Sequence, residues 1–414
     1  MNIFNSLGSN YDFGFVIKSL FGGFNDSAKE QLKRLLQNKY GGLPILVYKG
    51  REAITLALEI LNLPKDSTVA INGFTCFAVY KAIENGGHIP ELLDLDNSNT
   101  SFSLDLNFSA SKLSKAVGQN PKIKAVIIQN TLGYPCDIEE IVKICRKNNL
   151  ILIEDLAHCV GTRHLPANAT HKALQAGKSG KEAGTVGDLV VLSFSQDKII
   201  DAVSGGALII RNKRYQNYFL ASQGDALRSL RSKNISFKQQ EVDRLYPLFT
   251  FIMRKTYPIG VGKLIHFILK RLNFLSKPMN ESFYERYELP KLYISLVLDN
   301  FKNLSKNLGH RRTIASIYKE TLSKSIASDF INKNINLSSN LRYPIFVENR
   351  TSLVEYLKKQ GIYVSDIWYD SVDQSLTNAK NISDKILNLP THKNISVKEA
   401  KILAGKINLW LKLK

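Results

Sequence analysis

The fold is indicated first by the stretch Leu189-Val190-Val191-Leu192-Ser193-Phe194-Ser195-Gln196-Asp197-Lys198. It begins as a short apolar run, which is typical of a buried strand in a parallel sheet, and a lysine follows shortly after the run ends. A second run, Ile151-Leu152-Ile153-Glu154-Asp155, ends in a carboxylate 43 positions before Lys198. We therefore predict that Asp155 and Lys198 stand at the carboxyl ends of neighbouring strands in one sheet.

Outward from these two runs, residues 48–212 alternate helix-like stretches with short β-branched runs. This alternation predicts an α/β domain with a mostly parallel sheet covered by helices. The predicted strands are Thr68 to Ile71, Glu91 to Leu95, Ala125 to Gln129, Leu150 to Glu154, Leu189 to Phe194 and Ala207 to Ile210. The predicted helices between them are Ala53 to Leu61, Phe77 to Glu84 and Ile138 to Asn148.

The chain of 414 residues is longer than one hydrophobic core usually supports, so we expect more than one domain. We expect a large domain at 1–215, a basic and aromatic helical insertion at 216–300, and a smaller C-terminal α/β domain at 301–414. The last contains predicted helices at Arg311 to Leu322, Ser352 to Lys359 and Val397 to Leu411, and a strand at Tyr343 to Val347. Residues 166–183, rich in Ala, Gly, Lys and Ser, are expected to form a mobile loop near the site.

The composition favours a protein of the cell interior. The cysteines, Cys76, Cys136, Cys145 and Cys159, form no Cys-x-x-Cys pair and no metal-like grouping with histidine, so we expect free thiols, no metal site and a reducing cytoplasm. The first ten residues do not resemble a secretory signal. No run approaches the ~18 apolar residues of a membrane span.

The net charge of +20 favours anionic partners. Phosphorylated substrates, acidic lipid and nucleic acid all qualify, although we do not expect nucleic acid. The segment from Arg228 to Arg271 contains ten basic residues and only two acidic ones, Glu241 and Asp243. We favour a pair of core or dimer-interface helices with basic outer faces there, because apolar helical stripes are usually core. The alternative is peripheral contact with an acidic membrane surface at the inner membrane face.

Lysine and aspartate at neighbouring strand ends suit pyridoxal 5'-phosphate chemistry. A lysine amine can form a Schiff base with the cofactor aldehyde, and a carboxylate keeps the pyridine nitrogen protonated. A buried carboxylate also needs a cationic partner, which a pyridinium supplies. The competing interpretation, a surface Lys198 and a helix-capping Asp155, would hold for either residue taken alone.

Further candidates surround this pair. Gly50 and Arg51 precede a predicted helix, whose first amides could hold a phosphate, although one glycine before a helix also fits a plain turn. Ser193 could donate to the same phosphate, or be an ordinary strand residue. His158 could hydrogen-bond the cofactor's phenolic oxygen or stack on its ring, and a structural histidine is nearly as good an explanation.

The order of these motifs resembles the DegT/DnrJ/StrS family of sugar aminotransferases, which are fold type I pyridoxal phosphate enzymes. The segments that carry the resemblance are Gly50-Arg51-Glu52-Ala53, Phe74-Thr75-Cys76, Gly133-Tyr134-Pro135-Cys136-Asp137, Glu154-Asp155-Leu156-Ala157-His158, Gly187-Asp188, Ser193 to Lys198, Gly205-Gly206 and, further on, Arg311 to Tyr318 and Asn388 to His392. The resemblance implies an aspartate-aminotransferase-like large domain with a sheet of the seven-stranded type, a small C-terminal domain and a homodimer with sites at the subunit interface.

The resemblance also implies roles. Lys198 would be the covalent attachment point and then the proton carrier, Asp155 would pair with the pyridine nitrogen, and Ser193 and the amides near Gly50, Arg51 and Glu52 would hold the phosphate. His158 takes a place where the family usually has Gln or His.

Three departures from the family pattern concern the cofactor's surroundings. Cys76 replaces a common stacking aromatic, so stacking would fall to Phe77, to another residue or to no aromatic. Ser195 stands where the family often has His. The asparagine motif that reaches the partner's phosphate is not found, and we expect residues 211–289 to replace it.

The favoured function is transfer of an amino group, from glutamate, to a nucleotide-linked keto sugar for cell-surface polysaccharide or related amino-sugar biosynthesis. Arg342 is a candidate anchor for the donor carboxylate, with a surface arginine as the default. Trp368 is a candidate for the sugar pocket, with core packing as the default.

Two alternatives stay open: a sugar dehydratase, which Lys198 argues against because the related dehydratases carry histidine there, and a membrane-surface or anion-binding protein that uses residues 228–271.

Overall fold

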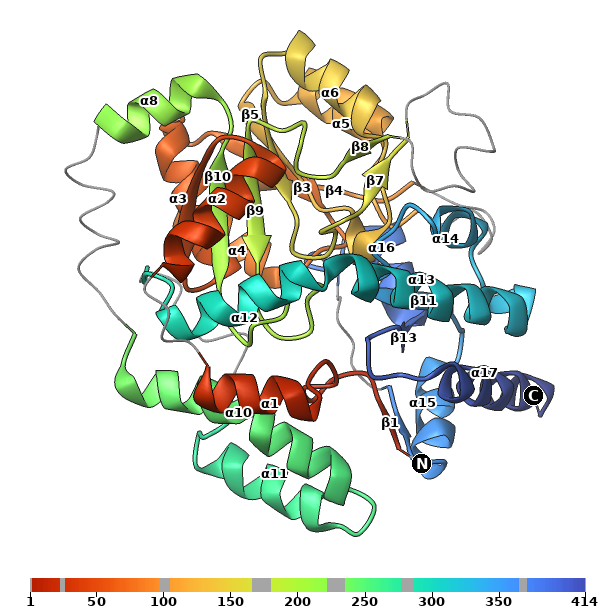
Figure 1. Cartoon of the computed structure of the whole chain (residues 1–414). Coiled ribbons are helices and arrows are strands. Elements are labelled where there is room, and N and C mark those ends of the chain that lie inside the picture. Colours follow the sequence, from red (N-terminus) through yellow and green to blue (C-terminus); the bar gives the residue numbers. More distant parts are fainter. Residues whose placement is uncertain are drawn as a thin grey trace.

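A seven-stranded sheet forms the centre of the protein, in the order β2-β10-β9-β6-β5-β3-β4 (Figure 1). The computed structural model describes residues 2–22, 27–96, 105–165, 180–221, 235–276, 286–364 and 371–413. The strands are β2 (Leu43–Val47), β3 (Thr68–Asn72), β4 (Ile89–Leu93), β5 (Ile123–Ile128), β6 (Ile151–Asp155), β9 (Leu189–Ser193) and β10 (Gly206–Ile210). All neighbours are parallel except β10, which is antiparallel to β9 and β2. The predicted mostly parallel α/β sheet is confirmed.

Helices cover both faces of the sheet, which explains why its strands are apolar throughout. One face packs on α3 (Gly50–Leu61), α4 (Phe77–Asn85) and α8 (Lys213–Ala221), and the other on α2 (Ala28–Tyr40), α5 (Ala110–Gln119), α6 (Ile138–Lys147) and α12 (Lys291–Lys302). In β9, Leu189 and Val191 join the first core, whereas Val190 and Leu192 join the second. Each such side chain contributes about 1.5–3 kcal/mol by leaving water.

The C-terminal part forms a second core around a small antiparallel sheet. Strand β11 (Arg342–Phe346) pairs with β13 (Ile386–Pro390). The surrounding helices are α13 (Leu304–Thr321), η3 (Lys324–Ile326), α14 (Asp329–Asn334), α15 (Arg350–Lys359), α16 (Thr377–Lys385) and α17 (Val397–Lys412). The N-terminal strand β1 (Ile3–Phe4) pairs with β12 (Ile362–Tyr363), so the first residues join this part and not the large sheet as the predicted division had it.

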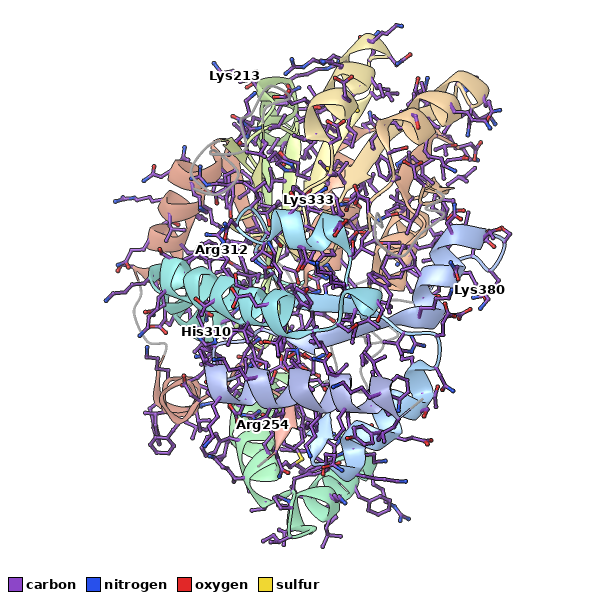
Figure 2. All side chains as sticks on the ribbon, turned by 90° about the vertical axis from the view of Figure 1, so that its right-hand side faces the viewer. Lys213, Arg254, His310, Arg312, Lys333 and Lys380 are labelled. Carbon is purple, nitrogen blue, oxygen red and sulfur yellow. The ribbon has the colours of Figure 1, made fainter. Side chains whose placement is uncertain are left out.

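Three further helices form a layer beneath the carboxyl ends of the sheet strands (Figure 1). Helices α1 (Phe13–Phe21) and α11 (Val261–Arg271) both pack against α10 (Phe237–Thr256). Helix α10 buries Val242, Tyr246 and Met253, as the core interpretation of this basic region predicted. In α11 only Gly262 is buried within the chain, so α11 is not a core helix, and its placement at a dimer interface stays a prediction. Side chains of this layer, with Arg254 on α10 labelled, are drawn in Figure 2.

The predicted loop 166–183 lies mostly outside the described residues, which resume at position 180. Within its described end, Lys181–Glu182 form strand β8, which pairs antiparallel with β7 (Arg163–His164). One turn of 3-10 helix, η2 (Thr131–Gly133), follows β5. Of the helices that the structure describes, none combines the length and the apolar character needed to cross a membrane.

Candidate active site

Asp155 and Lys198 line one cavity of about 1020 Å³ at the carboxyl ends of the sheet strands. Asp155 is the last residue of β6, and Ser193 is the last residue of β9. The two strands are hydrogen-bonded parallel neighbours, with Asp155 opposite Val191. The prediction that the two catalytic candidates stand at neighbouring strand ends is thus confirmed, because parallel strands bring their carboxyl ends to one edge of the sheet.

The loop after β9 presents Lys198 to the cavity through a tight local fold. Asp197 adopts a left-handed backbone conformation with φ of 62°. Its backbone N–H donates to the Asp201 carboxylate at 2.7 Å, and the same carboxylate accepts the Tyr11 hydroxyl at 2.8 Å. The backbone N–H of Ala202 donates a hydrogen bond to the Phe194 carbonyl at 2.8 Å. The lysine therefore projects from a loop whose turn is held by hydrogen bonds at both ends.

The Lys198 amine contacts a buried histidine. Its Nζ lies 3.0 Å from Nε2 of His158. Burial lowers the pKa of Lys198 from its ordinary value, and the nearby Asp155 raises it by a smaller amount. Burial, together with the positive charges of Lys198 and Arg342, holds the pKa of His158 well below its usual range. The imidazole is therefore neutral near pH 7 and can accept a hydrogen bond from the amine.

Asp155 is a buried carboxylate that accepts hydrogen bonds from neutral donors. The backbone N–H of Ala157 donates to Oδ1 at 2.9 Å, and the Gln129 side-chain amide donates to Oδ2 at 3.2 Å. Burial raises the pKa of Asp155, while these hydrogen bonds and Lys198 lower it. Among the residues with described positions, Asp155 forms no ion pair. A cationic ring nitrogen in the cavity would compensate this charge, so the carboxylate fits a pyridinium group.

A second part of the cavity suits a phosphate. Gly50 is the first residue of α3, and the N-terminal amides of a helix favour an anion. A Cβ atom at Gly50 would lie only 2.7 Å from Cβ of Ser193, so the glycine allows the helix start to approach the end of β9. Arg51 and the buried Lys49 line the same region. Helix amides, a hydroxyl and two cationic side chains thus fit the phosphate of the cofactor that the sequence predicts.

Two predicted cofactor ligands do not line the cavity. Glu52 accepts the backbone N–H groups of Tyr48 and Tyr287 at 3.2 and 3.3 Å, and burial raises its pKa to about 7. Phe77 is 44% exposed, and its ring stacks on Tyr80 with centroids 5.8 Å apart. Cys76, which replaces the common stacking aromatic, does line the cavity. The turn into α4 thus aims the residue before Phe77 inward and the aromatic ring outward.

Of the two residues predicted to contact substrate, Arg342 and Trp368, the structure describes only Arg342. Arg342 is completely buried on β11, so the surface position taken as its default is wrong. It donates to the backbone carbonyls of Asn5 at 2.7 Å and Leu341 at 3.0 Å, and its guanidinium lies 3.6 Å from the Asp197 carboxylate. It thus contacts the loop that carries Lys198 and does not itself line the cavity. Trp368 lies outside the described residues.

Several cavity residues were missed by the sequence reasoning. Gln129 follows β5 at the same sheet edge, and the rule that selected Asp155 would have found it. Most of the others come from distant segments, and no local sequence signal marks them. They are Tyr246, Tyr257, His266, Lys270 and Asn273 of the α10–α11 region, and Glu355, Lys358 and Tyr363 of the C-terminal part. The described residues contain no cluster of side chains suited to a metal ion.

Comparison with known proteins finds relatives of this chain. Residues 19–246 and 274–408 match the DegT/DnrJ/EryC1/StrS aminotransferase family. The chain is 29% identical over 181 residues to GDP-perosamine synthase of Escherichia coli O157:H7, a match that covers 44% of each protein. It is 25% identical over 368 residues to UDP-4-amino-4,6-dideoxy-N-acetyl-beta-L-altrosamine transaminase of Campylobacter jejuni, covering 85% of this chain and 81% of that protein. The chain thus spans less than half the length of the first relative.

A solved structure shares the whole fold. It is that of Helicobacter pylori PseC, an aminotransferase involved in the biosynthesis of pseudoaminic acid. The TM-score is 0.72 at 14% sequence identity, and the superposition covers 100% of both chains.

Proposed function

Since the chain belongs to the DegT/DnrJ/EryC1/StrS aminotransferase family, we propose that it is a pyridoxal phosphate-dependent aminotransferase that acts on a nucleotide-linked keto sugar, with glutamate as the amino donor. One observation carries the proposal. A single cavity contains a buried lysine amine, a buried carboxylate that lacks an ionic partner among the described residues, and a helix start at Gly50 that approaches Ser193.

The chemistry divides between the cofactor and the chain. When bound, pyridoxal phosphate supplies a ring that withdraws electrons from the carbon next to the amino nitrogen. Asp155 would hold a proton on the ring nitrogen, and the amides near Gly50 with the Ser193 hydroxyl would hold the phosphate. Burial lowers the pKa of Lys198, which favours the neutral amine that can take up a proton, and Nζ lies 3.0 Å from Nε2 of His158.

The proposed substrate class rests on size and charge. A cavity of about 1020 Å³ exceeds what an amino acid donor requires. Lys270 and Lys358 line it in addition to the two cationic side chains near the cofactor phosphate, and such cations suit a diphosphate. The names of the E. coli and C. jejuni relatives are those of enzymes of GDP- and UDP-linked sugars. We place the product in cell-surface polysaccharide or related amino-sugar biosynthesis.

We further propose a cytoplasmic homodimer, as in the family, with the two sites near the subunit interface.

The sugar dehydratase alternative is disfavoured by Lys198, since the residue that related dehydratases replace is present here and lies in the cavity.

The test is a labelled amino-transfer assay. The purified full chain is loaded with pyridoxal phosphate and incubated with nitrogen-labelled glutamate and a panel of GDP-, UDP- and TDP-linked keto sugars, and products are identified by mass spectrometry. We expect one nucleotide sugar to acquire the labelled amino group. If the cofactor binds but no sugar is aminated, the substrate class is wrong. If the cofactor does not bind, the aminotransferase proposal itself fails.

A further inference from the structure

An exposed apolar face covers the outer side of helix α11. Its large side chains are Ile259, Val261, Leu264, Phe267, Ile268 and Leu272, which we call the α11 face. Leu264, Phe267 and Leu272 are 58%, 62% and 63% exposed. Soluble proteins seldom expose a contiguous apolar patch unless it contacts a partner or a membrane.

Helix α11 is already fixed on its inner side, so this face is not waiting to join the core. Gly262 packs against α10 so closely that a Cβ atom there would lie 2.2 Å from the Met253 carbonyl oxygen. His266 and Lys270, on another side of the helix, line the catalytic cavity. The apolar residues therefore stay outward while the helix serves as a wall of the site.

The chain segment that carries the face is basic. Residues 244–276 contain no Asp or Glu. The exposed basic residues are Lys255, Lys263, Lys270 and Arg271. Lys263 Nζ lies 5.5 Å from the centre of the Tyr257 ring, and Lys255 Nζ lies 5.8 Å from that of Phe251. Apolar side chains bordered by lysine and arginine on an amphipathic helix are typical of a helix that lies in the interface of a bilayer.

We propose that the α11 face docks the protein onto a bilayer surface that contains anionic lipid. Leu264 and Phe267 enter the boundary between headgroups and acyl chains, and Lys255, Lys263 and Arg271 contact lipid phosphates. A second copy of the chain fits this face less well. If a two-fold axis passed through this face, these cations would meet an identical set without an acidic residue of 244–276 to offset them.

Docking would place a wall of the catalytic cavity at the membrane, because α11 contributes His266 and Lys270 to that cavity. The inference does not depend on the reaction that the cavity performs. It can therefore hold or fail independently of the aminotransferase proposal.

The test is sedimentation of the full chain with two kinds of vesicle, one of phosphatidylcholine alone and one of phosphatidylcholine mixed with phosphatidylglycerol. We expect at least tenfold stronger binding to the anionic vesicles and loss of that preference at high salt. Leu264→Asp should lower the binding at least tenfold, because it places a carboxylate at the centre of the face. Lys263→Glu should weaken binding to the anionic vesicles and reduce its salt dependence.

The matched control is Leu409→Asp, which changes another leucine that is 48% exposed, on α17. This variant should bind like the wild type. Circular dichroism and cofactor absorbance establish that each variant is folded. Equal or absent binding to both vesicles, or unchanged binding by Leu264→Asp, would overturn the proposal. If sedimentation velocity shows a dimer that Leu264→Asp dissociates, the face is instead an interface between copies of the chain.

Discussion

Lys198 owes its acid–base properties to burial. Its amine lies within a cavity, 3.0 Å from the His158 imidazole, and burial lowers the pKa of both groups. The same removal from water raises the pKa of Asp155. Burial disfavours the charged form of each of these three groups, so each pKa shifts in the direction that favours the neutral form. A bound cationic ring would lower the pKa of Asp155 again.

We predict that Lys198→Ala abolishes both the covalent attachment of pyridoxal phosphate and the amino-transfer activity. The substitution removes the proposed attachment atom and proton carrier, so kcat should fall by about 10²–10⁴ or more. Visible absorbance of the protein and mass spectrometry after borohydride reduction measure attachment separately from activity. Lys213→Ala, on the exposed end of α8, is the control and should behave like the wild type. A coloured, borohydride-labelled Lys198→Ala protein would contradict the assignment.

Glu52 gives a prediction about stability and pH. Burial raises its pKa from an ordinary 4.5 to about 7. The folded protein therefore holds a proton that the unfolded chain has lost between these pH values, so the free energy of unfolding falls as pH rises through this window. The difference corresponds to about 3 kcal/mol at most. In Glu52→Gln the part of this loss that Glu52 contributes should disappear, and denaturant unfolding at pH 5 and pH 8 measures it.

The control for that measurement is Glu320→Gln, on the exposed end of α13, which should keep the pH dependence of the wild type. If Glu52→Gln loses as much stability between pH 5 and pH 8 as the wild type does, Glu52 does not titrate in this range in the folded protein.

At the scale of secondary structure, the site depends on how closely α3 approaches the end of β9. Gly50 starts the helix, and Lys49 pairs with Gly205 in a parallel bridge next to it. A Cβ atom at Gly206 would lie 2.8 Å from the Gly50 nitrogen. Backbone thus packs against backbone around the proposed phosphate position, where side chains would keep the amides away from an anion.

We predict that Gly50→Ala weakens pyridoxal phosphate binding at least tenfold, because the added Cβ would meet Ser193 at 2.7 Å and displace the helix start. It should also lower the free energy of unfolding by about 1–3 kcal/mol. Absorbance titration measures the affinity, and denaturant unfolding measures the stability.

Gly118→Ala serves as the control for this element. No heavy atom lies within 4 Å of a Cβ placed there, in helix α5. That variant should bind the cofactor normally and gain up to about 1 kcal/mol in stability, because alanine favours a helix. Normal cofactor affinity in Gly50→Ala would contradict the proposed phosphate position.

In the whole molecule, the catalytic cavity is enclosed by segments far apart in the chain. The N-terminal segment contributes Phe4 and Leu7, the α10–α11 region contributes Tyr246 and the C-terminal part contributes Tyr363. Arg254 joins two of them, since it donates to the backbone carbonyls of Leu7, Gly8 and Tyr11 from its place on α10 (Figure 2). Burial lowers the pKa of Arg254 to about 10, so the guanidinium remains charged at neutral pH.

We predict that Arg254→Gln lowers the free energy of unfolding by about 3 kcal/mol and raises KM. The change removes charge-assisted hydrogen bonds from buried carbonyls, and each such bond contributes about 1.5–3 kcal/mol. The neighbouring exposed Lys255→Gln should alter stability by less than about 0.5 kcal/mol. Denaturant unfolding and the KM for the sugar substrate test this. Equal stability of the two variants would show that the N-terminal segment is held by other contacts.

The strands of the large sheet could be predicted because their signal is local. An uninterrupted apolar run such as Val190–Leu192 indicates a strand buried on both faces, and six of the seven sheet strands were located within two residues or less at either end. Strand β2 was missed, since Pro44 interrupts its short apolar run. The position of Glu52 inside the predicted motif did not reveal that its side chain turns away from the cavity.

The amino-acid sequence by itself determined the α/β class, the parallel neighbours β6 and β9, and the meeting of Asp155 with Lys198 at one sheet edge. The spacing of apolar residues indicates each strand, and the common direction of the strands brings their carboxyl ends together. Both signals can be read from stretches of a few residues. Only the tertiary structure decided that Arg342 is buried against Asp197, that Phe77 faces outward and that α11 walls the cavity with its apolar side exposed. These contacts join segments far apart in the chain, and packing of whole elements, which no local pattern encodes, selects them.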